Sequence, residues 1–136
     1  DGRDNYVYTL LGDGEIQEGQ VWEAAMFASH YKLDNLTLFL DFNCLQIDGD
    51  IRKVLNPTPF DEKYKAFGWH TIVIDGHNFE EIEKAVAEAE QTKGMPTAII
   101  CRTIKGKGVS YMENVADWHG KAPNEELYKI AKAELA

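Results

Sequence analysis

The sequence predicts an α/β fold in which a parallel, doubly wound sheet carries helices on both of its faces. Short apolar, β-prone runs alternate with helix-prone segments, and this pattern implies parallel strands joined by right-handed crossovers. A glycine-containing turn, Gly12-Asp13-Gly14, follows the first apolar run. The 136 residues have room for one domain with a hydrophobic core, and the 44% hydrophobic content is ordinary for a globular protein.

The first half of the chain predicts two neighbouring strands and the helix between them. Residues 6–11 form a short apolar strand, residues 17–31 are helix-prone and apolar on more than one face, and residues 36–40 form a buried strand. A helix with two apolar faces is expected to pack against the sheet on one side and against more protein on the other. Residues 50–59 are polar and contain prolines, so a surface loop is expected there.

The second half predicts a third and a fourth strand, over residues 69–74 and 97–102, with a helix that starts near Phe79 between them. Ahead of the third strand, Thr58 is expected to cap a short helix that has Pro59 at its first position and Gly68 at its carboxyl-terminal end. The remaining expectations are an irregular segment over residues 109–119 that packs over the active face and a closing helix over residues 124–135.

Asp13 and Asn43 each follow a predicted strand at its carboxyl end. Because the carboxyl ends of parallel strands meet at one edge of the sheet, these two side chains are expected to lie together. Carboxylate and amide oxygens are ligands that Mg²⁺ or Ca²⁺ takes, with phosphate and water oxygens in the remaining positions. The alternative is that Gly12-Asp13-Gly14 is a tight turn and Asn43 a turn former. Their joint placement favours a metal-bound diphosphate.

The charge and the cysteine content exclude several classes of partner. A net charge of -9 and a pI near 4.8 argue against nucleic acid and against an anionic membrane, since both attract basic surfaces. Cys44 and Cys101 are the two cysteines, and neither stands in a metal-type spacing. With no signal peptide and no long apolar span in these residues, a reducing, cytoplasmic setting is expected.

Two residues outside the first turn are candidates for chemistry. Lys105 lies in a glycine-containing turn at the carboxyl end of a predicted strand, where its ammonium can reach phosphate; the alternative is a plain surface lysine. His119 can serve as a proton donor or hydrogen-bond partner near neutral pH, although a lone histidine is more often structural. His30, His70 and His77 show no zinc-type spacing and are interpreted as structural.

Several separated motifs resemble the transketolase family over nearly the whole chain. Gly12-Asp13-Gly14 followed by Asn43 is similar to the general thiamine diphosphate motif. The motifs similar to transketolase in particular are Gly12-Asp13-Gly14-Glu15, Glu18-Gly19, Trp22-Glu23-Ala24, Ile47-Asp48-Gly49, Ala66-Phe67-Gly68-Trp69-His70, Asp75-Gly76-His77, Thr103-Ile104-Lys105-Gly106-Lys107-Gly108 and Trp118-His119-Gly120.

The resemblance implies a set of metal and cofactor contacts. Asp13, the side chain of Asn43 and the backbone carbonyl of Leu45 are expected to hold Mg²⁺ or Ca²⁺. Gly14 and Asn43 also match residues that contact thiamine diphosphate, and Ile47 matches an apolar residue that packs against its rings. Cys44 departs from the pattern of many thiamine enzymes, which have a second asparagine there, and this departure leaves the metal ligands unaffected.

The resemblance also implies roles for four charged or titratable side chains. Lys105 matches a lysine at the cofactor, and His119 matches the histidine that touches both the diphosphate and the sugar. Glu18 and Glu23 match carboxylates between the two cofactors of a dimer; their alternative interpretations are a helix-start residue and an ordinary helical glutamate.

The implied activity is a transketolase reaction of the pentose phosphate pathway type, in which a two-carbon ketol unit moves from a ketose phosphate to an aldose phosphate. Residues 1–136 match one diphosphate-binding domain, whose amino-terminal part and whose pyrimidine-binding domain are expected outside them. The pyrimidine-binding domain, on the same chain or on a second subunit, supplies an essential glutamate, so this portion is expected to be inactive alone and to work as a homodimer or heterotetramer.

Two other classes of function stay open on the sequence. A deoxyxylulose phosphate synthase or a 2-oxoacid dehydrogenase shares the Gly-Asp-Gly and Asn motif but is not expected to have Trp118-His119-Gly120 together with Lys105. A non-catalytic phosphate-binding or scaffold module on the same fold is the other, because fold alone does not fix function.

Overall fold

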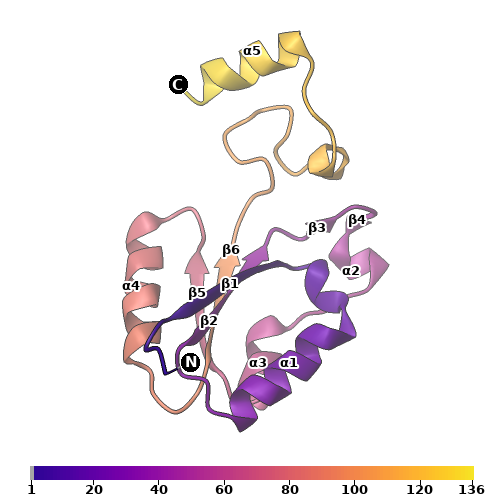
Figure 1. Ribbon diagram of the computed structural model, residues 1–136. Coiled ribbons are helices and arrows are strands. Elements are labelled where there is room, and N and C mark those ends of the chain that lie inside the picture. Colours follow the sequence, from indigo (N-terminus) through magenta and orange to yellow (C-terminus); the bar gives the residue numbers. More distant parts are fainter. Residues whose placement is uncertain (1) are drawn as a thin grey trace.

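A four-stranded parallel sheet forms the centre of the protein, for which a computed structural model describes residues 2–136 (Figure 1). The strands lie in the order β1-β2-β6-β5. Their bounds are Val7–Gly12 for β1, Leu36–Phe42 for β2, His70–Asp75 for β5 and Thr97–Arg102 for β6. All three pairings are parallel, which confirms the predicted sheet.

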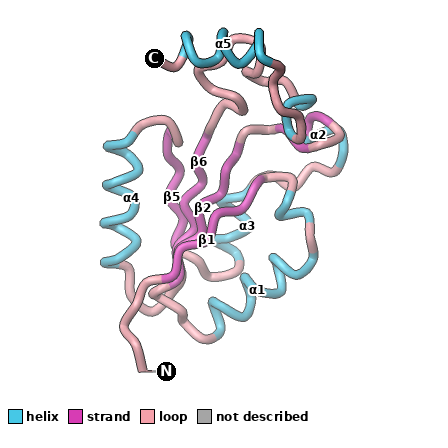
Figure 2. The backbone as a smooth tube through the Cα atoms, turned by 45° about the horizontal axis from the view of Figure 1, so that its top comes forward, coloured by secondary structure: helices cyan, strands magenta, loops and turns pink. Residues whose placement is uncertain are grey.

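Helices cover both faces of the sheet, as predicted. α1 (Gly19–His30) and α3 (Phe60–Ala66) pack on one face, and α4 (Phe79–Gln91) packs on the other (Figures 1 and 2). The first face has a core that includes Leu38, Leu40, Ala25, Ala28, Phe60 and Tyr64, and the second has one that includes Ile99, Ile74, Ala85 and Ala89. Because both faces of β6 are covered, its first five residues are buried.

Local side-chain contacts explain where individual elements begin. Asn78 accepts hydrogen bonds from the amides of Glu80 and Glu81, so it caps the amino terminus of α4. Trp69 is buried ahead of β5 and donates from Nε1 to the carbonyl of Ala25 at 2.9 Å. Through this bond the start of β5 is fixed against α1.

The expected surface loop over residues 50–59 is wrong in its first part. Residues Leu45–Gln46 (β3) and Gly49–Asp50 (β4) pair as a small antiparallel hairpin, and α2 (Ile51–Val54) follows directly. Asp50 caps α2 by accepting from the Arg52 amide, and Ile51 is fully buried. A short polar window carries one apolar side chain into the core, and periodicity does not detect a single buried position of this kind.

The expected helix cap at Thr58 is also wrong. Pro59 is the capping residue of α3 and makes no side-chain capping bond, while the Thr58 hydroxyl donates instead to Asn56 Oδ1 at 2.8 Å. Gly68 follows the end of α3 with φ of +87°, a conformation that favours glycine, so the expected role of Gly68 at the end of this helix is confirmed.

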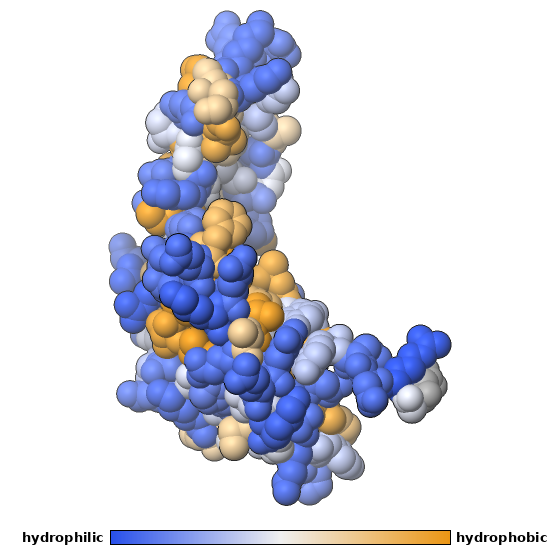
Figure 3. All heavy atoms as spheres, turned by 90° about the vertical axis from the view of Figure 1, so that its left-hand side faces the viewer, coloured by the Kyte–Doolittle hydropathy of each residue, from blue (hydrophilic) through white to orange (hydrophobic). Residues whose placement is uncertain are grey.

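The last part of the chain extends past the carboxyl edge of the sheet. It contains a short 3₁₀ helix, η2 (Ala116–His119), and the closing helix α5 (Glu125–Glu134). Tyr111 donates from its hydroxyl to the Leu127 carbonyl at 2.9 Å, and Ser110 donates to Glu134 at 2.6 Å, so α5 is held by the segment before η2. Figure 1 shows this part beyond the ends of the strands, and in the space-filling view it forms the upper lobe of the molecule (Figure 3). Across residues 2–136, no helix combines the length and the hydropathy needed to cross a membrane.

Candidate active site

A cavity of about 480 Å³ lies at the carboxyl edge of the sheet, where β1 and β2 end. The register pairs Gly12 with Asp41, and the amide of Asp13 donates to the Asp41 carbonyl at 3.1 Å, so the two strand ends lie side by side. The residues that line the cavity are Gly12, Asp13, Gly14, Glu15, Gln17, Glu18, Asp41, Asn43, Leu45, Gln46, Ile47, Asp48, Lys105 and His119.

The structure brings the predicted site residues together with one exception. Asp13, Gly14, Glu18, Asn43, Leu45, Ile47, Lys105 and His119 all line this cavity. Glu23 does not: it lies on the exposed surface of α1, beyond Glu18 at the helix start. Of residues 109–119, which were expected to pack over the active face, His119 at the end of η2 lines the cavity.

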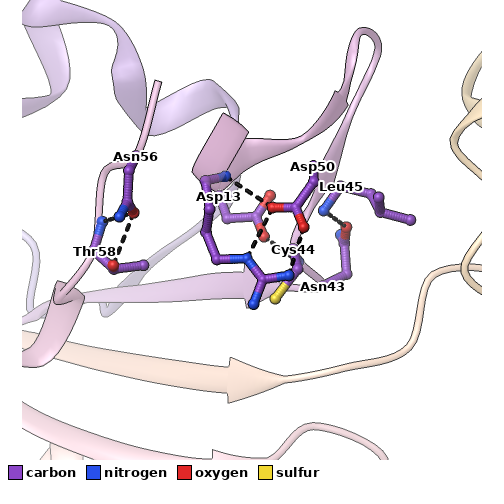
Figure 4. A network of polar contacts seen from close by, with 8 residues as sticks. Asp13, Asn43, Cys44, Leu45, Asp50, Asn56 and Thr58 are labelled. Atoms are coloured by element: carbon purple, nitrogen blue, oxygen red, sulfur yellow. Dashed lines mark hydrogen bonds and ion pairs between the residues drawn. The ribbon is translucent and has the colours of Figure 1, made fainter. Parts of the chain in front are cut away.

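Asp13 is a buried carboxylate. Its side chain is 1% exposed, and its Oδ2 accepts the Cys44 amide at 2.5 Å (Figure 4). Burial raises the pKa of Asp13 to about 6, and the nearby Asp41 charge raises it as well, while the amides of Cys44 and Gly14 act in the opposite direction. No cationic side chain of residues 2–136 contributes to this pKa. A buried carboxylate without a cation beside it fits a metal ligand.

Asn43 is held in one orientation by its neighbours. Its Oδ1 accepts the Leu45 amide at 2.9 Å (Figure 4), and its Nδ2 donates to Asp41 Oδ2 at 3.0 Å. The hydroxyl of Thr103, at the end of β6, donates to the other oxygen of Asp41. Asp41 therefore joins the ends of two strands and fixes the amide of Asn43.

The sequence interpretation missed Asp41, which lines the cavity, and its hydrogen bond with Thr103. Asp41 is the penultimate residue of β2 and stands two positions before Asn43, and Thr103 directly follows β6. The available signal was a second carboxylate at the same strand end as Asn43. Its second partner, Thr103, lies 62 positions away at the end of another strand, so the local sequence did not reveal that bond.

Gly14 makes a close contact that no other residue allows. A Cβ atom at this position would lie 2.7 Å from Cβ of Gln46 in the β3–β4 hairpin. The carboxylate of Glu15 accepts the Gly12 amide at 3.1 Å, which fixes the same turn from its other side. The glycine thus lets the first turn pack directly against β3, and this packing forms one wall of the cavity.

Lys105 and His119 meet at the opposite wall. Lys105 Nζ lies 3.2 Å from His119 Nδ1, and the Lys105 carbonyl accepts the amide of Asn114 at 2.9 Å. The ammonium of Lys105 is the cavity's one lysine or arginine charge among residues 2–136, whereas five carboxylates line it: Asp13, Glu15, Glu18, Asp41 and Asp48. An anion as highly charged as a diphosphate is repelled by such a lining unless a divalent cation binds with it.

The donor set fits a hard divalent cation that is shared with a ligand. Within residues 2–136, no group of three or more His, Cys, Asp or Glu side chains is placed to hold a metal ion. Asp13 supplies a carboxylate and Asn43 an amide oxygen, and Leu45 lines the cavity beside them. So few protein ligands suit Mg²⁺, which binds through one or two carboxylates together with substrate phosphates and water.

Cys44 occupies a strained backbone position between Asn43 and Leu45. Its φ is +67°, in the left-handed region that disfavours residues other than glycine and asparagine. We expect Cys44→Asn to raise the free energy of unfolding by about 0.5–1 kcal/mol, because asparagine tolerates this conformation. Urea unfolding measures the change. Cys44→Ala keeps the same strain and should give no gain; equal stabilisation by both variants would contradict the backbone explanation.

This arrangement defines the class of the protein as an α/β domain with an acidic ligand cavity at the carboxyl edge of a parallel sheet. The family described as "Transketolase, thiamine diphosphate binding domain" matches residues 1–136. The chain belongs to this family.

Individual relatives agree with the family. The chain is 48% identical over 131 residues to a subunit of the 6-deoxy-6-sulfo-D-fructose transketolase of Clostridium sp. (strain MSTE9), a match that covers 96% of this chain and 48% of that protein. It is 40% identical over 136 residues to one subunit of the apulose-4-phosphate transketolase of Phocaeicola vulgatus, covering 100% of this chain and 48% of that protein. The chain thus spans about half the length of these curated relatives.

A solved transketolase has the same fold. The crystal structure of transketolase from Campylobacter jejuni superposes with a TM-score of 0.90 at 36% sequence identity, covering 96% of this chain and 20% of that one. The parallel sheet and the helices on its two faces are therefore those of the thiamine diphosphate-binding domain.

Proposed function

We propose that this chain is the diphosphate-binding part of a transketolase, which transfers a two-carbon ketol unit from a ketose phosphate to an aldose phosphate with thiamine diphosphate and Mg²⁺. The observation that carries the proposal is the convergence of Asp13 and Asn43 from two strands on a cavity that Lys105 and His119 close from the other side.

The cation is held by oxygen atoms of this chain. Asp13, Asn43 Oδ1 and the Leu45 carbonyl are the proposed ligands of Mg²⁺ or Ca²⁺, and the diphosphate completes the coordination. The buried, unpaired carboxylate of Asp13 supports this assignment, as does the acidic lining of the cavity. The cation reduces the negative potential that five lining carboxylates create, so the diphosphate and the metal bind together.

The remaining cavity residues bind and orient the cofactor and the sugar. The Lys105 ammonium binds a diphosphate oxygen, and His119 donates a hydrogen bond to the diphosphate and to the sugar. Ile47, at the tip of the β3–β4 hairpin and 73% exposed, packs against the rings of the cofactor. Gly14 lets the backbone approach the cofactor closely. Bound thiamine diphosphate supplies the carbanion chemistry of the transfer.

A second domain completes the site. Two relatives, whose matches cover 96% and 100% of this chain, are named as subunits, which supports a partner that carries the pyrimidine-binding domain, in a homodimer or heterotetramer. Glu18 and Glu23 are proposed to lie between two cofactor sites of that assembly; both are exposed in the single chain. The free thiols of Cys44 and Cys101 support a reducing, cytoplasmic setting.

The relatives' names guide the choice of substrate. One names a sulfonated ketose and the other a phosphorylated sugar, so an anionic group on the sugar is common to both names. A panel of phosphorylated and sulfonated ketoses, with an aldose phosphate as acceptor, is therefore the appropriate substrate test. Pentose phosphate pathway sugars form part of that panel.

Titration calorimetry of the whole protein with its pyrimidine-binding partner tests the proposal. We expect thiamine diphosphate to bind in the presence of Mg²⁺ and to lose at least about 100-fold in affinity when the metal is chelated, because the acidic cavity then repels the diphosphate. Asp13→Ala should have the same effect, whereas Asp4→Ala, at an exposed position outside the cavity, should have none.

Two outcomes would contradict the proposal. The first is an absence of thiamine diphosphate binding even with the partner present, which would favour a scaffold role. The second is robust ketol transfer by residues 1–136 alone, because the proposal assigns an essential part of the site to the pyrimidine-binding domain.

A further inference from the structure

The turn after β5, formed by residues 75–78, lies against the segment that carries Lys105. The Gly76 amide donates to the Arg102 carbonyl at 2.9 Å, at the end of β6. A Cβ atom on Gly76 would lie 2.5 Å from Cγ2 of Thr103 and 2.9 Å from Cβ of Cys101. The two turns are therefore packed as closely as their atoms allow, although they are far apart in the sequence.

Residues 104–108 are called the Lys105 turn below. In residues 2–136, the structure shows one direct hydrogen bond between this turn and residues 75–78, and His77 makes it. Its Nε2 accepts the amide of Ile104, the residue before Lys105, at 2.8 Å. An imidazole nitrogen that accepts a backbone N–H carries a lone pair, so the ring proton lies on Nδ1. The bond thus requires a histidine with a defined tautomer, or a side chain with an acceptor at the same reach.

The turn that carries His77 is itself fixed. The His77 amide donates to Asp75 Oδ1 at 2.9 Å, and Asn78 caps α4. The Asp75 amide donates to Glu81 at 2.8 Å on the first turn of the same helix. The imidazole is therefore presented by a rigid junction between β5 and α4, which packs on the sheet.

The Lys105 turn has few other connections to the sheet. Two residues before Lys105, the Thr103 amide donates to the Phe42 carbonyl at 3.1 Å, and the Thr103 hydroxyl donates to Asp41. The Lys105 carbonyl accepts the Asn114 amide at 2.9 Å, and the Ile104 carbonyl accepts the Lys107 amide at 3.1 Å. Both partners belong to the segment that follows, which stands beyond the sheet edge (Figures 1 and 3). Apart from the bonds of Thr103, the bond between His77 and Ile104 is the hydrogen bond in residues 2–136 that ties the backbone next to Lys105 to the sheet that carries Asp13 and Asn43.

We propose that His77 is a positioning residue for the diphosphate site: by accepting the Ile104 amide it holds the Lys105 turn at the distance from the metal ligands that the diphosphate requires. The inference rests on the proposed function, because it concerns the phosphate contact of Lys105. It gives a role to the Asp75-Gly76-His77 motif, which lies outside the cavity.

Two variants of the whole protein with its partner separate this role from general destabilisation. His77→Leu removes the acceptor and leaves the Ile104 amide without its partner, whereas the Oε1 atom of His77→Gln reaches the same point. We expect His77→Leu to weaken Mg²⁺-dependent binding of thiamine diphosphate about 5- to 30-fold and His77→Gln to weaken it less than about 3-fold. His70→Gln, at the other end of β5 in a pair with Glu88, is the matched control and should leave the affinity unchanged.

A readout without any cofactor tests the bond itself. Amide hydrogen exchange at Ile104 and Lys105 should be at least about tenfold faster in His77→Leu than in the wild-type protein and close to wild type in His77→Gln. The proposal is overturned if the wild-type protein binds thiamine diphosphate and His77→Leu binds it equally well, or if exchange at Ile104 is unchanged. If the wild-type protein binds no thiamine diphosphate, the proposed function fails and this role fails with it, whatever the exchange rates show about the bond.

Discussion

Asp13→Asn is expected to stabilise the metal-free protein above pH 6. The same variant is expected to lower the Mg²⁺-dependent affinity for thiamine diphosphate at least about 100-fold. The carboxylate is buried without a cation, and burial raises its pKa from 3.8 to about 6. Ionised Asp13 therefore lowers the free energy of unfolding of the metal-free protein. This decrease amounts to roughly 3 kcal/mol for a shift of about two pKa units.

The size of this stabilisation depends on pH. Because the folded pKa lies above the unfolded value, the favourable contribution of protonated Asp13 is complete below pH 3.8 and is lost as the pH rises through about 6. Asparagine stays neutral, so the variant should gain about 1–3 kcal/mol over the wild-type protein at pH 8 and almost nothing at pH 4. Urea unfolding at the two pH values in chelator measures the difference, and calorimetry measures the affinity.

A matched control is Asp61→Asn, which alters a half-buried carboxylate paired with Lys65 on α3. It should change neither the pH dependence of stability nor cofactor binding. If Asp13→Asn were less stable than the wild-type protein at pH 8, Asp13 would be a structural carboxylate whose charge is stabilised by its neighbours in the fold. That result would remove the main support for the metal site.

Gly106→Ala is expected to lower the free energy of unfolding by about 2–4 kcal/mol and the affinity for thiamine diphosphate at least tenfold. Gly106 follows Lys105 with φ of +72°, and a Cβ atom there would lie 2.6 Å from the Met112 carbonyl oxygen. The left-handed conformation costs about 1 kcal/mol, and the backbone clash adds about 1–3 kcal/mol and moves the turn. Displacing the turn carries the Lys105 ammonium away from His119.

Gly94→Ala isolates the clash from the conformational cost. Gly94 has a similar φ of +76°, but a Cβ atom there would meet nothing within 4 Å. This variant should lose about 1 kcal/mol and bind the cofactor normally. If the two variants lose the same stability, or if Gly106→Ala binds thiamine diphosphate with wild-type affinity, the placement of the Lys105 turn against Met112 is wrong.

The layered fold could be predicted because the composition and the hydrophobic periodicity of each segment indicate whether it forms a strand or a helix. The apolar run over residues 97–102 and the capped, amphipathic segment from Asn78 onward report strand and helix by composition and periodicity alone. Alternation of such segments then leaves few topologies. The α2 helix and the β3–β4 hairpin were missed because each is too short to produce a period, and the burial of Ile51 depends on the neighbours that the sheet brings to it.

The candidate site was predictable as a set of residues and only partly as a geometry. Asp13 and Asn43 stand at strand ends, so their convergence follows from the parallel sheet, and the roles of Lys105 and His119 came from the family resemblance. The role of Asp41 depends on bonds to side chains from the ends of two strands, and the contact of His77 with Ile104 crosses from one turn to another. Pairings of this kind are set by the order of the strands, which the local sequence does not contain.

The sequence by itself determined the alternation of strands and helices, the chemical types of the ligands and the family to which they point, because these depend on residue identity and short-range spacing. The tertiary structure decided that Asp13 is buried without a cation, that Glu23 lies outside the cavity, and that His77 reaches the Lys105 turn. Burial and long-range contact arise only when distant segments pack, and packing is what sets the pKa of Asp13 and the position of Lys105.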